Sequence, residues 1–167
     1  LDGTVQALNL PARAGLHGVM DDRLVFTVEQ DWSWAMQPVS SGTLMAVDLG
    51  LLRSAAPTVS SDTTTVFTPG QRQSIEDVAV FDDHLVVAVS DTVVGTLRRV
   101  AFGMNGQPSW GSQPIATPAN SAVGLGDASR GSGRLFVSTQ GFLVPPTLSL
   151  LGEGSDALSA VKSAPAL

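Results

Sequence analysis

The chain has 167 residues, of which 43% are hydrophobic and 14% charged, and its formal net charge is −6. This composition excludes a disordered chain and predicts a folded domain or a large part of one. The balance of nine Lys and Arg against 15 Asp and Glu argues against a nucleic-acid-binding surface, which requires basic charge.

No membrane span and no disulfide framework are expected. The longest apolar run, Leu85 to Val89, has the length of a strand and falls far short of the roughly 18 residues of a membrane helix. The absence of cysteine excludes thiolate metal sites and leaves the compartment open between cytoplasm and periplasm. The chain starts at Leu1 without an initiator Met or a signal-peptide pattern. Because it starts and stops abruptly in patterned sequence, we interpret it as a fragment.

The first expected element is a strand over residues 4–10, which ends before Pro11. Three repeats follow, over residues 16–68, 74–117 and 121–164. Each repeat begins with a short apolar stretch, turns at acidic or glycine-rich residues and continues in a β-branched run. A third strand begins near a Thr-Leu pair, and a fourth ends before a proline.

The spacing of the repeats indicates the fold class. The leucines that begin the third strands, Leu44, Leu97 and Leu148, lie 53 and 51 positions apart. Four strands in about 50 residues are typical of propeller blades, whereas a sandwich would not repeat every four strands. We therefore predict an all-β partial β-propeller over residues 1–167. It would contain about three four-stranded antiparallel blades and, at residues 4–10, the outer strand of a preceding blade.

Two further structural expectations follow. The segment from Asp48 to Ala55 is the one candidate for a short helical turn. Three blades cannot close a ring, so two apolar end faces should remain open. These faces would be covered by the rest of a ring or by self-association of the chain.

Three aromatic residues are candidates for an interdomain surface. Trp32 and Trp34 occupy an inserted loop, and Phe142 occupies the loop between the second and third strands of the last repeat. In a propeller these loops share one face with the connections between blades. The alternative for the two tryptophans is local core packing over their own blade. Exposed aromatic residues often mark interfaces.

The sequence offers no catalytic, cofactor-binding or metal-binding residue. It lacks the Gly-x-Ser-x-Gly pattern that holds the nucleophile of α/β-hydrolases, and Gly131-Ser132-Gly133 has the composition of a turn. His17 and His84 have no sequence partner at triad or metal-ligand spacing. The carboxylate pairs Asp21-Asp22 and Asp82-Asp83 occupy equivalent turns of successive repeats, and turn chemistry explains them.

The segment from Arg134 to Leu148 resembles the last propeller blade of the prolyl oligopeptidase family. Its Gly-Phe-Leu-Val-Pro-Pro-Thr-Leu run is similar to a motif that precedes the return to the hydrolase domain in that family. Two further stretches resemble bacterial members, one with Asp31-Trp32 and Ser41 to Leu49, the other from Ser74 to Val78.

The resemblance implies a function for the parent protein. Such enzymes combine a seven-bladed propeller with an α/β-hydrolase domain that cleaves short peptides after proline. The propeller gates the active site by substrate size. The resemblance places the hydrolase domain outside this chain. The expected partners are that domain, a peptide substrate and further copies of the chain, with no nucleic acid and no membrane. The alternatives are a stand-alone propeller that binds or scaffolds, and a small intact enzyme, which conflicts with the missing nucleophile–base pair.

Overall fold

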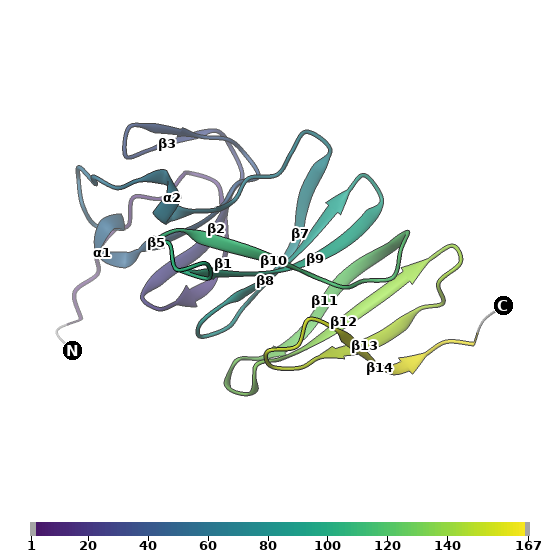
Figure 1. Ribbon diagram of the computed structural model, residues 1–167. Coiled ribbons are helices and arrows are strands. Elements are labelled where there is room, and N and C mark those ends of the chain that lie inside the picture. The colour runs from purple at the N-terminus through teal and green to yellow at the C-terminus, as the bar shows by residue number, and fades with distance from the viewer. Residues whose placement is uncertain (1–2, 166–167) are drawn as a thin grey trace. The chain divides into compact units, whose positions relative to one another are not determined.

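The computed structural model describes residues 3–165 and consists mainly of antiparallel β-sheets (Figure 1). Three four-stranded sheets and one two-stranded sheet are present, which matches the predicted all-β class. The chain divides into two compact units at the boundary between Thr68 and Pro69. The units are described separately below. No helix among residues 3–165 is long and apolar enough to cross a membrane.

The first unit contains one four-stranded sheet with the strand order β1-β2-β5-β6. Between its second and third strands lies an inserted two-stranded hairpin, β3-β4. The six strands are β1 (Ala14–Met20), β2 (Arg23–Val28), β3 (Trp32–Trp34), β4 (Gln37–Val39), β5 (Leu44–Asp48) and β6 (Thr65–Phe67).

The central strands of this sheet are apolar because both of their faces are covered. Leu44 to Val47 of β5 are all buried, and Val25 and Phe26 of β2 are completely inaccessible. The first hairpin closes at Asp21-Asp22, where both residues have positive φ, as a two-residue type I′ turn requires. The acidic pair is therefore explained by turn geometry.

Two short helices follow β5 in the first unit. Helix α1 (Leu49–Leu52) lies within the segment Asp48 to Ala55, where a helical turn is predicted. The Asp48 carboxylate caps it by accepting a hydrogen bond of 2.7 Å from the backbone N–H of Gly50. Helix α2 (Ser61–Thr64) is not predicted, since its Ser- and Thr-rich sequence resembles a loop; the Ser60 side chain caps it.

The expected strand over residues 4–10 is not formed. These residues have no strand pairing in the structure; instead the backbone N–H of Asn9 donates to Leu52 O over 2.8 Å. A strand needs a neighbouring strand to pair its backbone groups, and no described residue pairs with this segment in that way. Its assignment to a preceding blade remains a prediction.

The second unit contains two four-stranded antiparallel sheets, each in simple meander order. The second sheet of the molecule comprises β7 (Gln73–Val80), β8 (Leu85–Asp91), β9 (Val94–Phe102) and β10 (Trp110–Ile115). The third sheet comprises β11 (Ser121–Ser129), β12 (Arg134–Gly141), β13 (Thr147–Leu151) and β14 (Leu158–Ser163), with the short 3-10 helix η1 (Arg130–Ser132) between β11 and β12.

These two sheets share an apolar core. Val86 and Leu97 of the second sheet belong to the same buried cluster as Leu135 and Val137 of the third. At Gly95 the backbones approach so closely that an added Cβ would lie 2.6 Å from the Val123 nitrogen. Only glycine allows this approach.

One face of the third sheet is buried, and its other face is open. Along β12 burial alternates strictly: Leu135, Val137 and Thr139 are buried, whereas Phe136 and Ser138 are exposed. Successive side chains of a strand point to opposite faces, so the buried set lies against the second sheet and the other set lies on the outer face. We call this second face the outer face of the third sheet.

Candidate functional site

The two histidines lie in different surroundings. His17 in β1 is 2.7 Å from the Thr27 hydroxyl on the neighbouring strand. His84 directly precedes β8, with its ring stacked on Phe81 at a centroid distance of 4.6 Å. Its Nδ1 lies 2.6 Å from a carboxylate oxygen of Asp83, a contact with the adjacent residue that the sequence analysis did not predict.

The Asp83–His84 pair is a local contact at a turn. The hydrogen bond from His84 is the main cause that lowers the pKa of the Asp83 carboxyl, and Arg99 contributes in the same direction. The Asp83 side chain is 88% exposed, so water screens most of this interaction. A catalytic triad would need a serine nucleophile in addition to this histidine and carboxylate. Ser132 lies in η1 and not on the strand-to-helix turn that holds the nucleophile of α/β-hydrolases.

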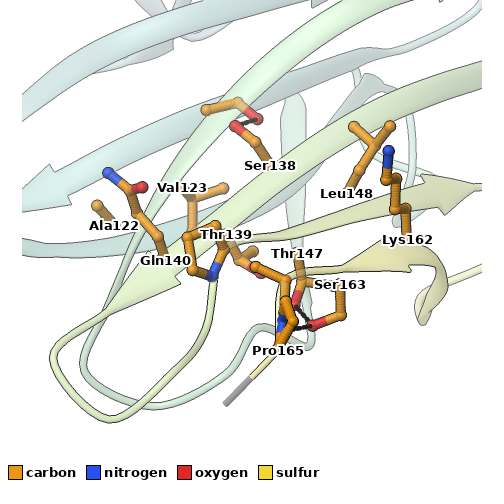
Figure 2. Close-up of a pocket in the computed structure, with 13 residues that line it drawn as sticks. Ala122, Val123, Ser138, Thr139, Gln140, Thr147, Leu148, Lys162, Ser163 and Pro165 are labelled. Atoms are coloured by element: carbon orange, nitrogen blue, oxygen red, sulfur yellow. Dashed lines mark hydrogen bonds between the residues drawn. The ribbon is translucent and has the colours of Figure 1, made fainter. Parts of the chain in front are cut away.

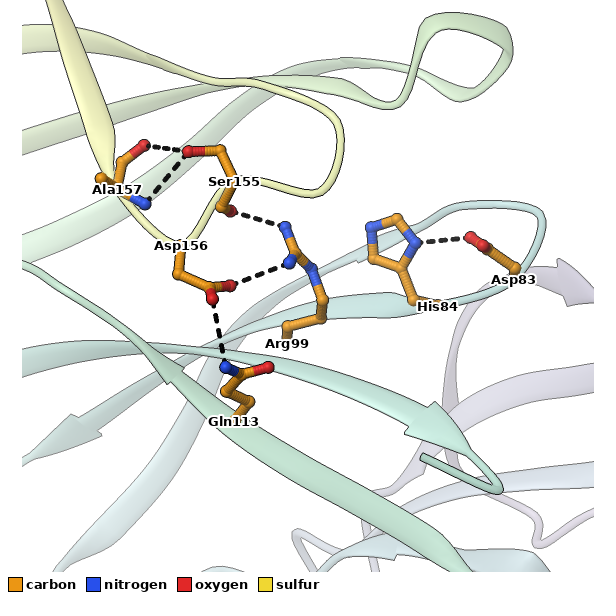
Figure 3. Close-up of polar contacts among 7 residues, drawn as sticks. All are labelled: Asp83, His84, Arg99, Gln113, Ser155, Asp156 and Ala157. Carbon is orange, nitrogen blue, oxygen red and sulfur yellow. Dashed lines mark hydrogen bonds and ion pairs between the residues drawn. The ribbon is translucent and has the colours of Figure 1, made fainter. Parts of the chain in front are cut away.

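A polar cluster joins the second and third sheets (Figure 3). Arg99 of β9 donates to the Asp156 carboxylate over 2.8 Å and to the Ser155 carbonyl over 2.6 Å. Gln113 of β10 donates to the other Asp156 oxygen over 3.1 Å. The turn between β13 and β14 is thereby held against the second sheet, and we name Arg99, Gln113, Ser155 and Asp156 the inter-sheet clamp.

A crevice of about 520 Å³ lies beside the clamp. Basic and acidic side chains both line it: His84, Arg99, Arg130, Asp82, Asp83 and Glu153. Arg130 and Asp82 form an ion pair of 3.5 Å, and Arg99 is bound to Asp156. Among residues 3–165 no group of three or more His, Asp or Glu side chains has an arrangement that could hold a metal ion.

A hollow lies on the outer face of the third sheet (Figure 2). It has a volume of about 790 Å³, and Ser138, Gln140, Leu148 and Lys162 are among the side chains that line it. A hydrogen bond of 2.9 Å joins the hydroxyls of Thr147 and Ser163 at its edge. Small hydroxyls and aliphatic groups dominate the lining, and no nucleophile–base pair is built there.

The three predicted interface aromatics have different surroundings. Trp34 is only 4% exposed and belongs to the buried cluster of the first unit, so its ring cannot meet a partner. Trp32 is half-buried and stacks on Trp34 at a centroid distance of 5.2 Å. Both tryptophans therefore pack locally, because the β3–β4 hairpin folds onto its own unit. Phe142, in contrast, is 100% exposed.

Comparison with known proteins identifies peptidases. The chain is 28% identical over 160 residues to the uncharacterized peptidase y4nA of Sinorhizobium fredii, covering 95% of this chain and 21% of that protein. It is 22% identical over 149 residues to the uncharacterized peptidase RP174 of Rickettsia prowazekii, covering 87% of this chain and 20% of that protein. The chain thus spans about a fifth of the length of these relatives. No family model matches the chain.

Solved structures of two peptidases share the fold. The structure of a post-proline cleaving enzyme from Rickettsia typhi has a TM-score of 0.78 at 20% identity, over 95% of this chain and 22% of that one. Oligopeptidase B from Trypanosoma brucei has a TM-score of 0.60 at 15% identity, over 92% of this chain and 21% of that one. The chain is a homologue of peptidases with the fold of a β-propeller fragment, and the predicted resemblance to the prolyl oligopeptidase family is confirmed.

Proposed function

We propose that this chain is a non-catalytic propeller segment of a serine peptidase that cleaves short peptides after proline. The observation that carries the proposal is the fold match along 95% of the chain to a post-proline cleaving enzyme, of which the chain covers 22%. The named sequence relatives are peptidases as well. The segment would contribute about three of the blades, and the catalytic serine, aspartate and histidine would belong to a hydrolase domain elsewhere in the polypeptide.

The role of the segment would be to limit the size of substrates. A propeller that caps the active site admits flexible peptides and keeps folded proteins away from the nucleophile. In this arrangement the inner strands of each sheet line a channel. The inter-sheet clamp supports a structural role for this unit, because its charged and amide side chains are bound to one another.

The outer face of the third sheet would be covered by a further blade in a closed ring. This face carries Phe136 and Leu148, each 39% exposed, beside the hollow of about 790 Å³. Large apolar side chains on an open sheet face favour burial against another sheet. In the isolated 167-residue chain, a second copy would supply that cover.

Peptide hydrolysis by the full-length gene product tests the proposal. We expect cleavage of a short chromogenic peptide after proline and a loss of activity as the peptide is lengthened or embedded in a folded protein. A matched peptide with alanine in place of proline is the control and should be cleaved at least ten times more slowly, an order-of-magnitude expectation for a pocket that discriminates by shape. Equal cleavage of both peptides, or of folded and short substrates, would reject the proposal.

A further inference from the structure

The indole N–H of Trp34 is buried and has no hydrogen-bond acceptor among the residues that the structure describes. The residue is 4% exposed, and no described oxygen accepts a hydrogen bond from its Nε1. An indole nitrogen can only donate, and a buried tryptophan usually donates to a partner. A buried donor without an acceptor is costly, because it has lost its hydrogen bond to water. The Trp34 N–H therefore calls for an acceptor from outside the polypeptide.

A small cavity adjoins Trp34 within the first unit. Trp34 and Gln37 of the β3–β4 hairpin line it on one side, and Ser61 and Thr64 of helix α2 line it on another (Figure 1). Its volume is about 30 Å³. One water molecule occupies roughly 30 Å³ in the liquid, so the cavity has room for a water and for no organic ligand.

The lining of the cavity offers acceptors for such a water. Thr64 is 3% exposed, and its hydroxyl donates to the Ser61 carbonyl over 3.5 Å, the long limit of a hydrogen bond. A hydroxyl that donates keeps lone pairs that can accept. The Gln37 side chain ends in an amide, whose oxygen also accepts. A buried water needs two to four polar partners, and Trp34, Thr64 and Gln37 supply that number.

Thr43 provides a comparison within the same unit. Its hydroxyl oxygen is also buried without a partner among the described residues, and the residue is 2% exposed. Thr43 is not one of the described residues that line the cavity beside Trp34. A water needs space as well as a polar group, so this hydroxyl has no share in the site. Thr43 is therefore a matched control for Thr64.

We propose that one water molecule is bound in this cavity and joins the β3–β4 hairpin to helix α2. Trp34 Nε1–H donates to the water oxygen, and the water donates its two protons to the Thr64 hydroxyl and to the Gln37 amide oxygen. The hairpin is thereby held against its own unit through solvent as well as through the packing of its tryptophan rings. This inference does not depend on the proposed peptidase function.

A crystal structure of the full-length gene product tests the site. We expect one peak of electron density, of the size of a single water, within about 3.2 Å of both Trp34 Nε1 and Thr64 Oγ1. A cavity without density would overturn the proposal. Density too large for one water, or an indole turned so that Nε1 donates directly to a protein oxygen, would overturn it as well.

Hydrogen exchange followed by mass spectrometry tests the bridge in solution, also on the full-length gene product. Thr64→Val removes the acceptor and nearly keeps the shape of the side chain. We expect the backbone amides of residues 32–39 to exchange at least about fivefold faster in this variant, since an unsatisfied buried donor favours local opening. Thr43→Val should leave the exchange of these amides unchanged. Equal acceleration in both variants would overturn the bridge.

Two further outcomes separate the bridge from a local role of Thr64 in its helix. Faster exchange confined to residues 61–64 in Thr64→Val would reflect the lost contact with Ser61 alone and would overturn the proposal. In a Trp34→Phe background the donor is absent, so adding Thr64→Val should no longer speed exchange in the hairpin. An acceleration as large as in the wild-type background would show that the two side chains do not share a water.

Discussion

At the scale of single residues, Arg99 of the second sheet binds the third sheet through two hydrogen bonds. Its side chain is only 12% exposed and is bound to both Asp156 and the Ser155 carbonyl. Removing one partner of a mostly buried, charged hydrogen bond leaves the other partner poorly solvated. The neighbouring Arg98 offers a contrast, because it donates to Ser112 within its own sheet.

Arg99→Ala is therefore expected to lower the free energy of unfolding by about 1–3 kcal/mol, the range for charged hydrogen bonds. Arg98→Ala is the matched control, and its loss should stay below about 1 kcal/mol, as is usual for exposed contacts. Urea denaturation followed by tryptophan fluorescence measures both values. Equal losses for the two arginines would show that the inter-sheet clamp contributes nothing specific.

The Asp83–His84 contact predicts a small pH dependence. The pKa of Asp83 is lowered from 3.8, chiefly by the hydrogen bond from His84. A carboxyl whose pKa is lower in the folded state stabilises that state above its unfolded pKa, and this stabilisation is lost as the pH falls through the folded value. Wild-type protein should thus be more stable than Asp83→Asn at pH 6, and the difference should disappear in an acid titration as the pH falls through the lowered pKa of Asp83. A difference that grows toward low pH would contradict this reading.

At the scale of elements, close backbone approach controls how the two sheets of the second unit pack. A methyl group at Gly95 would meet Val123 backbone and side-chain atoms at 2.6 Å and 2.9 Å. Backbone cannot move aside as a flexible side chain would. Gly131 provides the comparison, since nothing lies within 4 Å of a Cβ added there.

Gly95→Ala is expected to destabilise the second unit by about 1–3 kcal/mol through overpacking, whereas Gly131→Ala should be nearly neutral. Thermal unfolding measured by circular dichroism compares the two variants. Adding Val123→Ala to Gly95→Ala should give little recovery, because the Val123 nitrogen remains in place. Full recovery would show that side-chain crowding alone explains the loss.

The elements differ in how far the sequence predicts them. The β-branched runs and the turns with Asp21-Asp22 mark strands through local patterns, and Asp48 marks the cap of α1. The expected strand over residues 4–10 is not formed in the structure, since its local pattern cannot supply a pairing partner. Arg99 and Asp156 lie 57 positions apart, so their contact depends on tertiary packing that no local signal encodes.

The predicted interface residues also show that local sequence does not encode tertiary packing. Hydrophobicity identifies Trp34 and Phe142 as equally good interface candidates, yet Trp34 is buried and Phe142 is fully exposed. The difference arises from the hairpin that folds Trp34 onto Phe26 and its neighbours, a feature of tertiary structure.

At the scale of the whole molecule, the open outer face of the third sheet predicts association of the isolated chain. Sedimentation at increasing protein concentration should detect dimers or larger species. Replacing both Phe136 and Leu148 by serine should shift the chain toward monomer, since these apolar side chains are partly exposed on that face. Phe142→Ser is a control on a separate surface. A wild-type chain that remains monomeric at all concentrations would contradict the open-face account.

We propose that residues 1–167 contain no part of the catalytic machinery of a serine peptidase. Labelling with a fluorophosphonate, which reacts with activated serines, followed by peptide mapping, tests it most directly. We expect the full-length gene product to be labelled at one serine outside this segment and the isolated chain to remain unlabelled under the same conditions. Stoichiometric labelling of a serine within residues 1–167, in either protein, would contradict the account.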